Sequence, residues 1–127
     1  MVAETREVWR LPHPSQEGEE GPEARLSEGT LTIRYDFEGA AGNYEWASFR
    51  FEDVIAFKFL SEEMCGEDQF AALDKLVEVK DSAWTQKVSD AYDVRGLQRH
   101  HYRVYFDDYG CFEVFSASFT PGTNGGP

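Results

Sequence analysis

The chain has 127 residues, of which 41% are hydrophobic, 15% aromatic and 28% charged. This length predicts one modest soluble domain, and the aromatic content is too high for a wholly disordered chain. With 24 acidic and 12 basic side chains the net charge is −12. That charge opposes binding to nucleic acid or to an anionic membrane, which needs clustered Lys and Arg, and it favours a basic protein partner.

The two ends of the chain differ in composition from its middle. Residues 11–29 are rich in Pro, Gly and Glu, which predicts a loop or mobile arm, and residues 120–127 read as a flexible Gly-rich tail. We therefore expect an N-terminal segment with an acidic loop (1–29), one globular domain (30–119) and a tail. The first residues lack the apolar run of a signal peptide, and no run of about 18 apolar residues occurs, so we expect a cytoplasmic protein.

Alternating apolar and polar residues predict antiparallel strands in the first half of the domain. Residues 30–37 alternate cleanly, and the turn residues of 38–43 lead into a second alternating run over 46–51. Residues 54–60 alternate again and predict a third strand. Three sequential strands are typical of an antiparallel meander.

The middle of the chain predicts two short helices. Between residues 67 and 76 an apolar residue recurs every three positions, which indicates a first helix. The apolar residues of this pattern are Phe70, Leu73 and Leu76. A brief strand is expected over 77–80, after which Asp81 or Ser82 can cap a second helix that places Trp84 on the sheet.

The last two strands, 101–106 and 111–119, form a predicted hairpin with Gly110 at the left-handed position of its turn. We expect Tyr105 to lie opposite Glu113, because this register keeps one face apolar. The polar face then carries His101, Arg103, Tyr105 and Glu113. The predicted fold class is α+β and β-rich: a mainly antiparallel sheet, made of a meander and a C-terminal hairpin, with one or two short helices packed on one face.

Neither a metal, nor a cofactor, nor a catalytic residue is predicted. Cys65 and Cys111 are not in a Cys-x-x-Cys pair and are expected to be reduced, largely buried thiols. His100 and His101 are adjacent on a strand, so they point to opposite faces and cannot chelate one ion. The acidic residues of 62–68 lack the ligand spacing of a calcium loop.

Two candidate sites of different classes follow. The first is an acidic surface for a basic protein partner, with an aromatic anchor. It comprises Glu62, Glu63, Glu67, Asp68, Asp107 and Asp108, with Tyr109 or Trp46 as the anchor. The second is a small-molecule or enzymatic pocket between sheet and helices, lined by Trp84, His101, Tyr105 and Glu113. A third possibility is self-association through Phe115 and Phe119, and the oligomeric state stays open.

The C-terminal third carries a family resemblance. Residues 81–84, with the sequence DSAW, and the hairpin of residues 100–114 resemble small acidic bacterial proteins with a helix and a closing hairpin. These are similar in style to the immunity proteins that neutralise secreted toxins. The resemblance implies an α+β fold and transfers no catalytic residue. We therefore favour a non-enzymatic binding protein and keep the pocket as the alternative.

Overall fold

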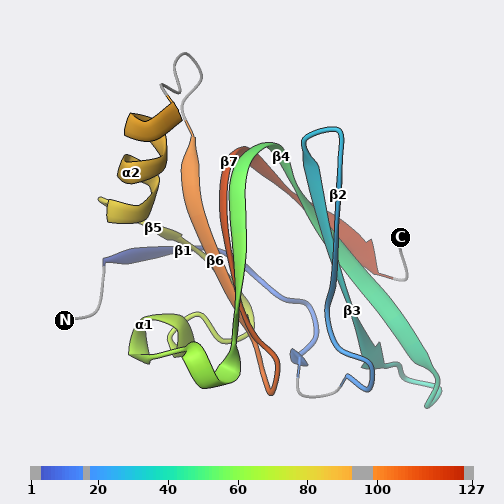
Figure 1. Cartoon of the computed structure of the whole chain (residues 1–127). Helices are drawn as coiled ribbons and strands as arrows, with labels where there is room; N and C mark the ends of the chain where they lie inside the picture. Colours follow the sequence, from blue (N-terminus) through green and yellow to red (C-terminus); the bar gives the residue numbers. More distant parts are fainter. Residues whose placement is uncertain (1–3, 16–17, 93–98, 125–127) are drawn as a thin grey trace.

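The computed structural model describes residues 4–15, 18–92 and 99–124 (Figure 1). As predicted, the protein is β-rich and has few helices. Within the described residues, seven strands form one antiparallel sheet in the order β1-β5-β6-β7-β4-β3-β2. The strands are β1 (Thr5–Arg10), β2 (Glu23–Ser27), β3 (Thr30–Glu38), β4 (Tyr44–Ser61), β5 (Lys75–Val79), β6 (His100–Phe106) and β7 (Gly110–Asn124). In the described part of the chain, the structure also has the 3₁₀-helix η2 (Glu62–Met64) and the helices α1 (Glu67–Phe70) and α2 (Ala83–Tyr92).

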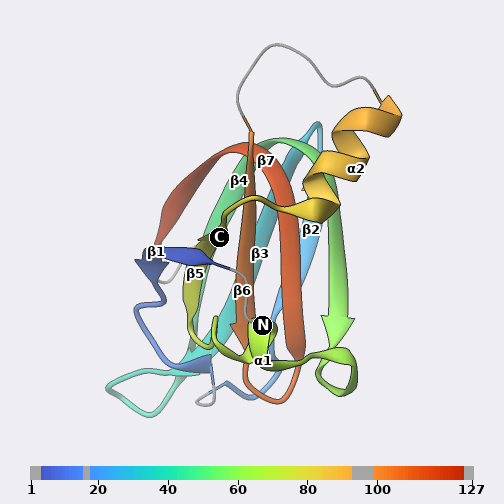
Figure 2. The same cartoon turned by 90° about the vertical axis from the view of Figure 1, so that its left-hand side faces the viewer.

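Strand β4 bends, and the sheet folds over on itself with it. The predicted strands 46–51 and 54–60 are the two halves of this one strand, so the prediction of two strands was wrong. Asp53 lies at the bend with a positive φ of 52°, and the pairing of β4 with β7 shifts register between Val54 and Ala56. Such a bulge bends a strand without ending it. The two resulting layers face each other in Figure 1, and in Figure 2 the layer with β6 and β7 lies in front of the layer with β2 and β3.

The core fills the space between the two layers. Apolar side chains of β3 and the first half of β4 face those of β6 and β7, as the alternation of each strand requires. The ring of Phe106 lies 5.5 Å from that of Tyr35 and 6.4 Å from that of Phe49, between ring centroids. Trp9 of β1 closes the core against Phe49 at 5.3 Å. One continuous aromatic core therefore joins β1, β3, β4 and β6.

The ends of the chain contribute more to the sheet than their composition predicts. Within the predicted N-terminal segment, β1 pairs with β5 and β2 pairs with β3, and the buried Leu11 belongs to the core. The predicted loop of 11–29 therefore contains a strand. The last strand reaches Asn124, inside the predicted tail of 120–127. The strands β1 and β2 are the two edges of the sheet, and the last residues of β7 pair with β4 alone, so each of these segments is held through its backbone on one side only.

A buried carboxylate holds the loop before β2. Asp36 of β3 accepts hydrogen bonds from the backbone N–H groups of Glu19, Glu20 and Gly21 at 2.9, 2.9 and 3.0 Å. Burial raises the pKa of Asp36, but these three N–H groups outweigh it and bring the pKa below its ordinary value. The charged carboxylate is therefore part of the folded structure.

Asp36→Asn is expected to lower the free energy of unfolding by about 2 kcal/mol, because the amide loses the charge and turns an NH₂ group toward N–H donors. Urea denaturation measures this change. Asp90→Asn, at an exposed position of α2, is the control and is expected to cost less than about 0.5 kcal/mol. Equal effects of the two substitutions would show that the three hydrogen bonds contribute nothing.

The first predicted helix is shorter than its pattern indicates. Helix α1 ends at Phe70, because the chain turns through Asp74, whose φ is 57°, into β5. Leu76 is buried in β5, whereas Phe70 and Leu73 are exposed rather than in the core. The apolar residues at every third position of 67–76 therefore span a short helix, a turn and the start of β5, and not one continuous helix. The helix predicted after Ser82 is confirmed, and Ser82 Oγ accepts a hydrogen bond from the Thr85 N–H at 3.1 Å as its cap.

The C-terminal hairpin has the predicted faces but a register that differs by two residues. Arg103 lies opposite Glu113, and Tyr105 lies opposite Cys111. A shift of two residues keeps each side chain on its face, so the polar face survives the correction.

The turn of this hairpin explains the difference. Asp108 takes the left-handed conformation, with φ 64°, in place of Gly110. Gly110 instead pairs with Phe106 and passes so close to β4 that a Cβ atom there would lie 2.1 Å from the carbonyl oxygen of Leu60. The glycine serves a close approach between strands, which only the tertiary structure reveals.

Candidate functional site

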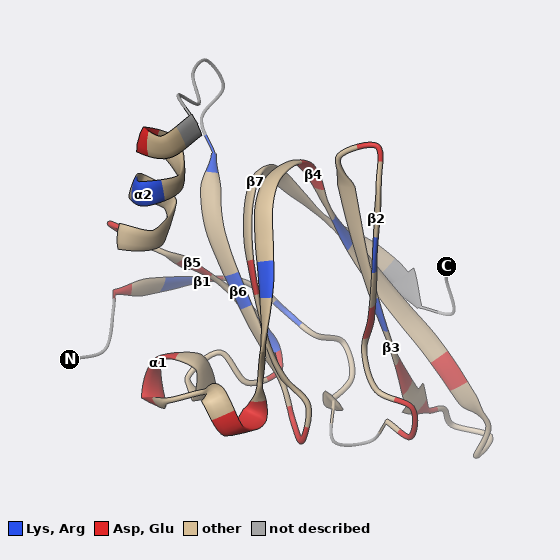
Figure 3. Ribbon diagram, in the orientation of Figure 1, with Lys and Arg blue, Asp and Glu red and all other residues tan. Residues whose placement is uncertain are grey.

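The acidic residues predicted as a partner surface come from three segments that meet at one end of the sheet (Figure 3). The Glu62 N–H donates to the carbonyl oxygen of Tyr109 at 3.0 Å, which ties η2 to the β6–β7 turn. The Tyr105 hydroxyl donates to Glu62 Oε2 at 3.0 Å. We call this surface the acidic end. It consists of Glu62, Glu63, Glu67, Asp68, Asp107 and Asp108.

Negative charge at the acidic end changes the ionisation of its neighbours. Burial raises the pKa of Asp107, and the nearby carboxylates of Asp108, Asp74 and Glu62 raise it further. Burial also raises the pKa of Tyr105, with the hydrogen bond to Glu62 in the same direction. The carboxylates are therefore close enough to repel one another, and a cationic partner would relieve that repulsion.

Exposed apolar side chains accompany the acidic end. Met64 is 71% exposed, Phe70 47% and Leu73 41%. The rings of Phe70 and Tyr105 lie 5.1 Å apart, and Leu73 forms a β-bridge with Tyr105. We call these three residues the apolar patch. In the sequence these three residues lie among the acidic residues of 62–73. Apolar residues interspersed with acidic ones in one segment were the signal of a mixed surface that the sequence analysis did not use.

The two aromatic residues predicted as anchors are engaged within the chain. The Tyr109 ring packs against the core, and its hydroxyl donates to the carbonyl oxygen of Glu19 at 3.5 Å. Trp46 lies on the β3–β4 ladder beneath the guanidinium of Arg34, at 4.2 Å from the ring centroid. The apolar patch, rather than either of them, provides exposed anchor side chains at the acidic end.

The residues predicted for self-association are also largely within the fold. Phe115 is buried, and Phe119 packs against Trp9 and Phe51, with ring centroids 5.4 and 5.7 Å away. The expectation that both lie exposed on one face was wrong, because the folded sheet buries Phe115 and packs Phe119 against the aromatic core.

A buried ion-pair network lies on the polar face of the sheet. Cross-strand pairing places Lys58 of β4, Glu113 of β7 and Arg103 of β6 in one row. Arg103 Nε donates to both carboxylate oxygens of Glu113, at 2.8 and 3.0 Å, and His101 Nε2 is hydrogen-bonded to Glu113 Oε1. Gln69 of α1 adds a longer bond at 3.4 Å. A cross-strand ion pair between Arg103 and Glu113 is thus present, and both of its side chains are buried.

Glu113 is ionised in this network. Its side chain is only 2% exposed, and burial raises its pKa. The hydrogen bond from His101 and the positive charge of Arg103 outweigh burial, so that the pKa of Glu113 lies below its ordinary value of 4.5. A buried carboxylate of this kind fixes the positions of the groups that bind it.

The start of α2 covers the network. The Oγ of Ser82 is hydrogen-bonded to His101 Nδ1 at 2.8 Å, and the ring of Trp84 lies edge-on to the His101 ring at 5.1 Å. The Nζ of Lys58 lies 4.5 Å from the centroid of Trp84. These contacts join β4, β6 and α2 around one small space.

This space is a pocket of about 280 Å³. Of the four residues predicted for a pocket, Trp84, His101 and Glu113 line it, whereas Tyr105 directs its hydroxyl to Glu62 instead. The other lining residues are Lys58, Leu60, Gln69, Val79, Lys80, Asp81, Ser82, Ala83 and Arg103. Residues from β4 and α1 could not be assigned from the sequence, because they meet the hairpin only in the folded sheet.

Hydrogen bonds connect Ser82 to His101 and His101 to Glu113. This arrangement resembles the nucleophile, base and orienting acid of a catalytic triad. Ser82 Oγ, however, also accepts the Thr85 N–H as the helix cap, and Arg103 neutralises Glu113. Both contacts weaken activation of the serine, since its lone pair is engaged and the charge behind the histidine is compensated. The arrangement is better suited to binding than to nucleophilic catalysis.

The remaining candidate ligands for metals are dispersed. His100 and His101 point to opposite faces as predicted, and His100 Nδ1 contacts Glu78 at 2.5 Å. Cys65 and Cys111 are both free, and burial raises the pKa of each thiol. In residues 4–15, 18–92 and 99–124 no group of three or more His, Cys, Asp or Glu side chains is placed to hold a metal ion. The same part of the chain contains no helix long and apolar enough to cross a membrane.

Comparisons with known proteins return no match, whether to family models, to curated proteins or to solved structures. The resemblance to immunity proteins therefore stays a prediction from the sequence.

Proposed function

We propose that this protein is a non-enzymatic binding domain that presents its acidic end to a basic protein partner. The observation that carries the proposal is the position of the apolar patch at that end. Carboxylates and exposed apolar side chains at the same end of the sheet match the anatomy of a protein interface, in which apolar anchors become buried and charges steer the approach.

The partner's chemistry follows from the same residues. It carries Lys and Arg side chains around an apolar area, so that cations face Glu62 and Asp108 while Met64 and Phe70 become buried. An immunity-like role against a basic toxin is one form of this function. The proposal also places α1 and α2 on one face of the sheet, which is supported by the contact of Phe70 with Tyr105 and of Trp84 with His101.

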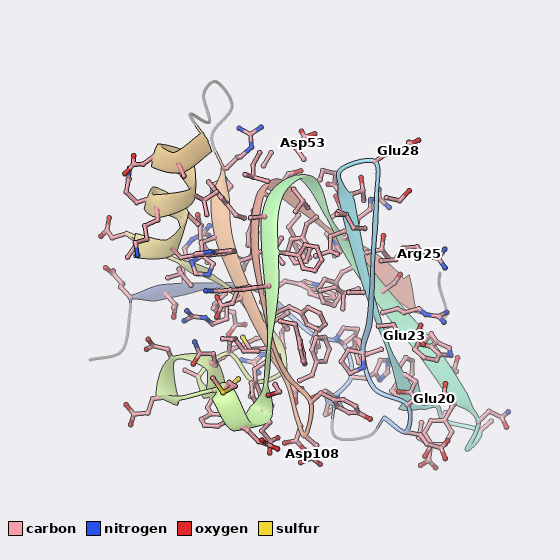
Figure 4. The ribbon with its side chains drawn as sticks, viewed as in Figure 1. Glu20, Glu23, Arg25, Glu28, Asp53 and Asp108 are labelled. Carbon is pink, nitrogen blue, oxygen red and sulfur yellow. The ribbon has the colours of Figure 1, made fainter. Side chains whose placement is uncertain are left out.

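Charge reversal at the acidic end tests this proposal. Glu63→Lys with Asp108→Lys is expected to weaken binding of a basic partner captured from native cells by at least about tenfold at low salt. The matched control is Glu28→Lys with Asp53→Lys, which makes the same change in net charge at the opposite end of the molecule (Figure 4). Glu28, Asp53 and Asp108 all have a positive φ, so each pair carries backbone strain. Equal weakening by both pairs, or capture of no basic protein, would contradict the proposal.

A second pair of variants tests the apolar patch. Phe70→Ser is expected to weaken the same complex by about tenfold or more, because a buried aromatic anchor is lost. Leu26→Ser changes a side chain that is similarly exposed, at 52%, but lies on edge strand β2. It is expected to change the affinity by less than twofold, as measured by surface plasmon resonance. Equal effects would remove the apolar patch from the interface.

A further inference from the structure

We propose that the pocket over Glu113 binds a small organic carboxylate, whose charge is held by Arg103 and Lys58 and whose apolar body lies against Trp84. This inference does not depend on the proposed function, because it concerns a different set of side chains.

The first observation is an unpartnered donor on the guanidinium of Arg103, one of the residues that line the pocket. Arg103 is only 6% exposed, and its Nε is occupied by Glu113. Its Nη1 atom is buried and has no hydrogen-bond partner among the residues that the structure describes. A buried charged donor without an acceptor is costly, so an acceptor supplied by a ligand is the simplest way to complete the site.

The second observation is the balance of charge in the pocket. Three cationic and two acidic side chains line it, namely Lys58, Lys80 and Arg103 with Asp81 and Glu113. Glu113 is already bound by Arg103 and His101. Neither Lys58 nor Lys80 has a carboxylate partner within the described part of the chain. The pocket is thus locally cationic in a protein with a net charge of −12.

The third observation is the size and polarity of the space. A volume of about 280 Å³ corresponds to roughly nine water molecules in the liquid, which is room for one small ring with a carboxylate. Leu60, Val79 and Trp84 supply apolar walls. A second negative charge on the ligand would face Glu113 and Asp81, so a monocarboxylate fits better than a phosphate dianion.

Benzoate is the probe, with benzamide as its neutral isostere and acetate as a carboxylate without the ring. Benzoate is expected to bind the full chain at low ionic strength with a Kd on the order of 1 mM and to shift the indole N–H signal of Trp84 in NMR spectra. Benzamide and acetate are each expected to bind at least about tenfold more weakly. Failure of benzoate to shift the Trp84 signal, or equal binding of benzamide, would overturn the proposal.

A matched pair of lysine variants locates the anion. Lys58→Met removes a cation that lines the pocket, whereas Lys87→Met removes an exposed cation of α2 that does not. The first is expected to weaken benzoate binding by about tenfold and the second by less than twofold. Equal weakening would mean that benzoate responds only to net charge and would overturn the site. If Lys58→Met fails to fold, the comparison of benzoate with benzamide on the unaltered chain still decides.

Discussion

Glu113→Gln is expected to lower the free energy of unfolding by about 3–5 kcal/mol at pH 7, because it leaves the buried Arg103 without its counter-charge. Glu113 is 1% exposed, and Arg103 Nε and His101 Nε2 are directed at its carboxylate. Urea denaturation followed by tryptophan fluorescence measures the change. Glu63→Gln removes an exposed carboxylate of η2 and is expected to cost less than about 0.5 kcal/mol.

The pH dependence of this loss has a definite sign. The folded-state pKa of Glu113 lies below its ordinary value of 4.5, so the stability it contributes is present above that value and is lost as the pH falls through the folded pKa. The difference between the wild-type protein and Glu113→Gln is therefore expected to shrink between pH 6 and acid pH. A difference that stays constant over this range would show that the ionised carboxylate is not the source of the stability.

Phe106→Ala is expected to lower the free energy of unfolding by about 3–5 kcal/mol, through lost burial and the cavity left between the two layers. Phe106 is fully buried, and its ring contacts those of Tyr35, Phe49 and Phe112. The residue therefore joins β6 to β3 and to both long strands. Thermal and urea unfolding give the value.

Phe57→Ala is the matched control for this prediction. Phe57 lies in β4 and is 39% exposed, so the same truncation removes much less buried area there. We expect it to cost about 1 kcal/mol or less. A similar loss at Phe57 and Phe106 would mean that the two-layer core is not the main source of stability.

Local patterns were sufficient for the parts of the fold that local physics decides. The alternation of residues 30–37 and 101–106 predicts β3 and β6 because one face of each strand is buried. The cap at Ser82 predicts α2 because its hydroxyl satisfies a free backbone N–H. The common face of His101, Arg103 and Glu113 follows from the same alternation and survived an error in register.

The candidate sites could be predicted only in part. The acidic residues are visible in the sequence, but the spacing of Phe70, Leu73 and Leu76 predicts only a short helix and does not show that Phe70 and Leu73 are exposed. In the structure α1 ends at Phe70, and the side chains of both Phe70 and Leu73 are exposed. For the pocket, Lys58 and Gln69 carry no local signal at all.

The sequence by itself determined a β-rich antiparallel domain, a polar face on its last hairpin and a strongly acidic charge, since each depends on residue type and on spacing within one element. The tertiary structure alone decided that β4 continues through Asp53, that β1 and β2 join the sheet, and that Arg103 and Lys58 flank Glu113. These features depend on backbone pairing between distant segments. Such pairing is set by the burial of the whole sheet, which no local pattern records.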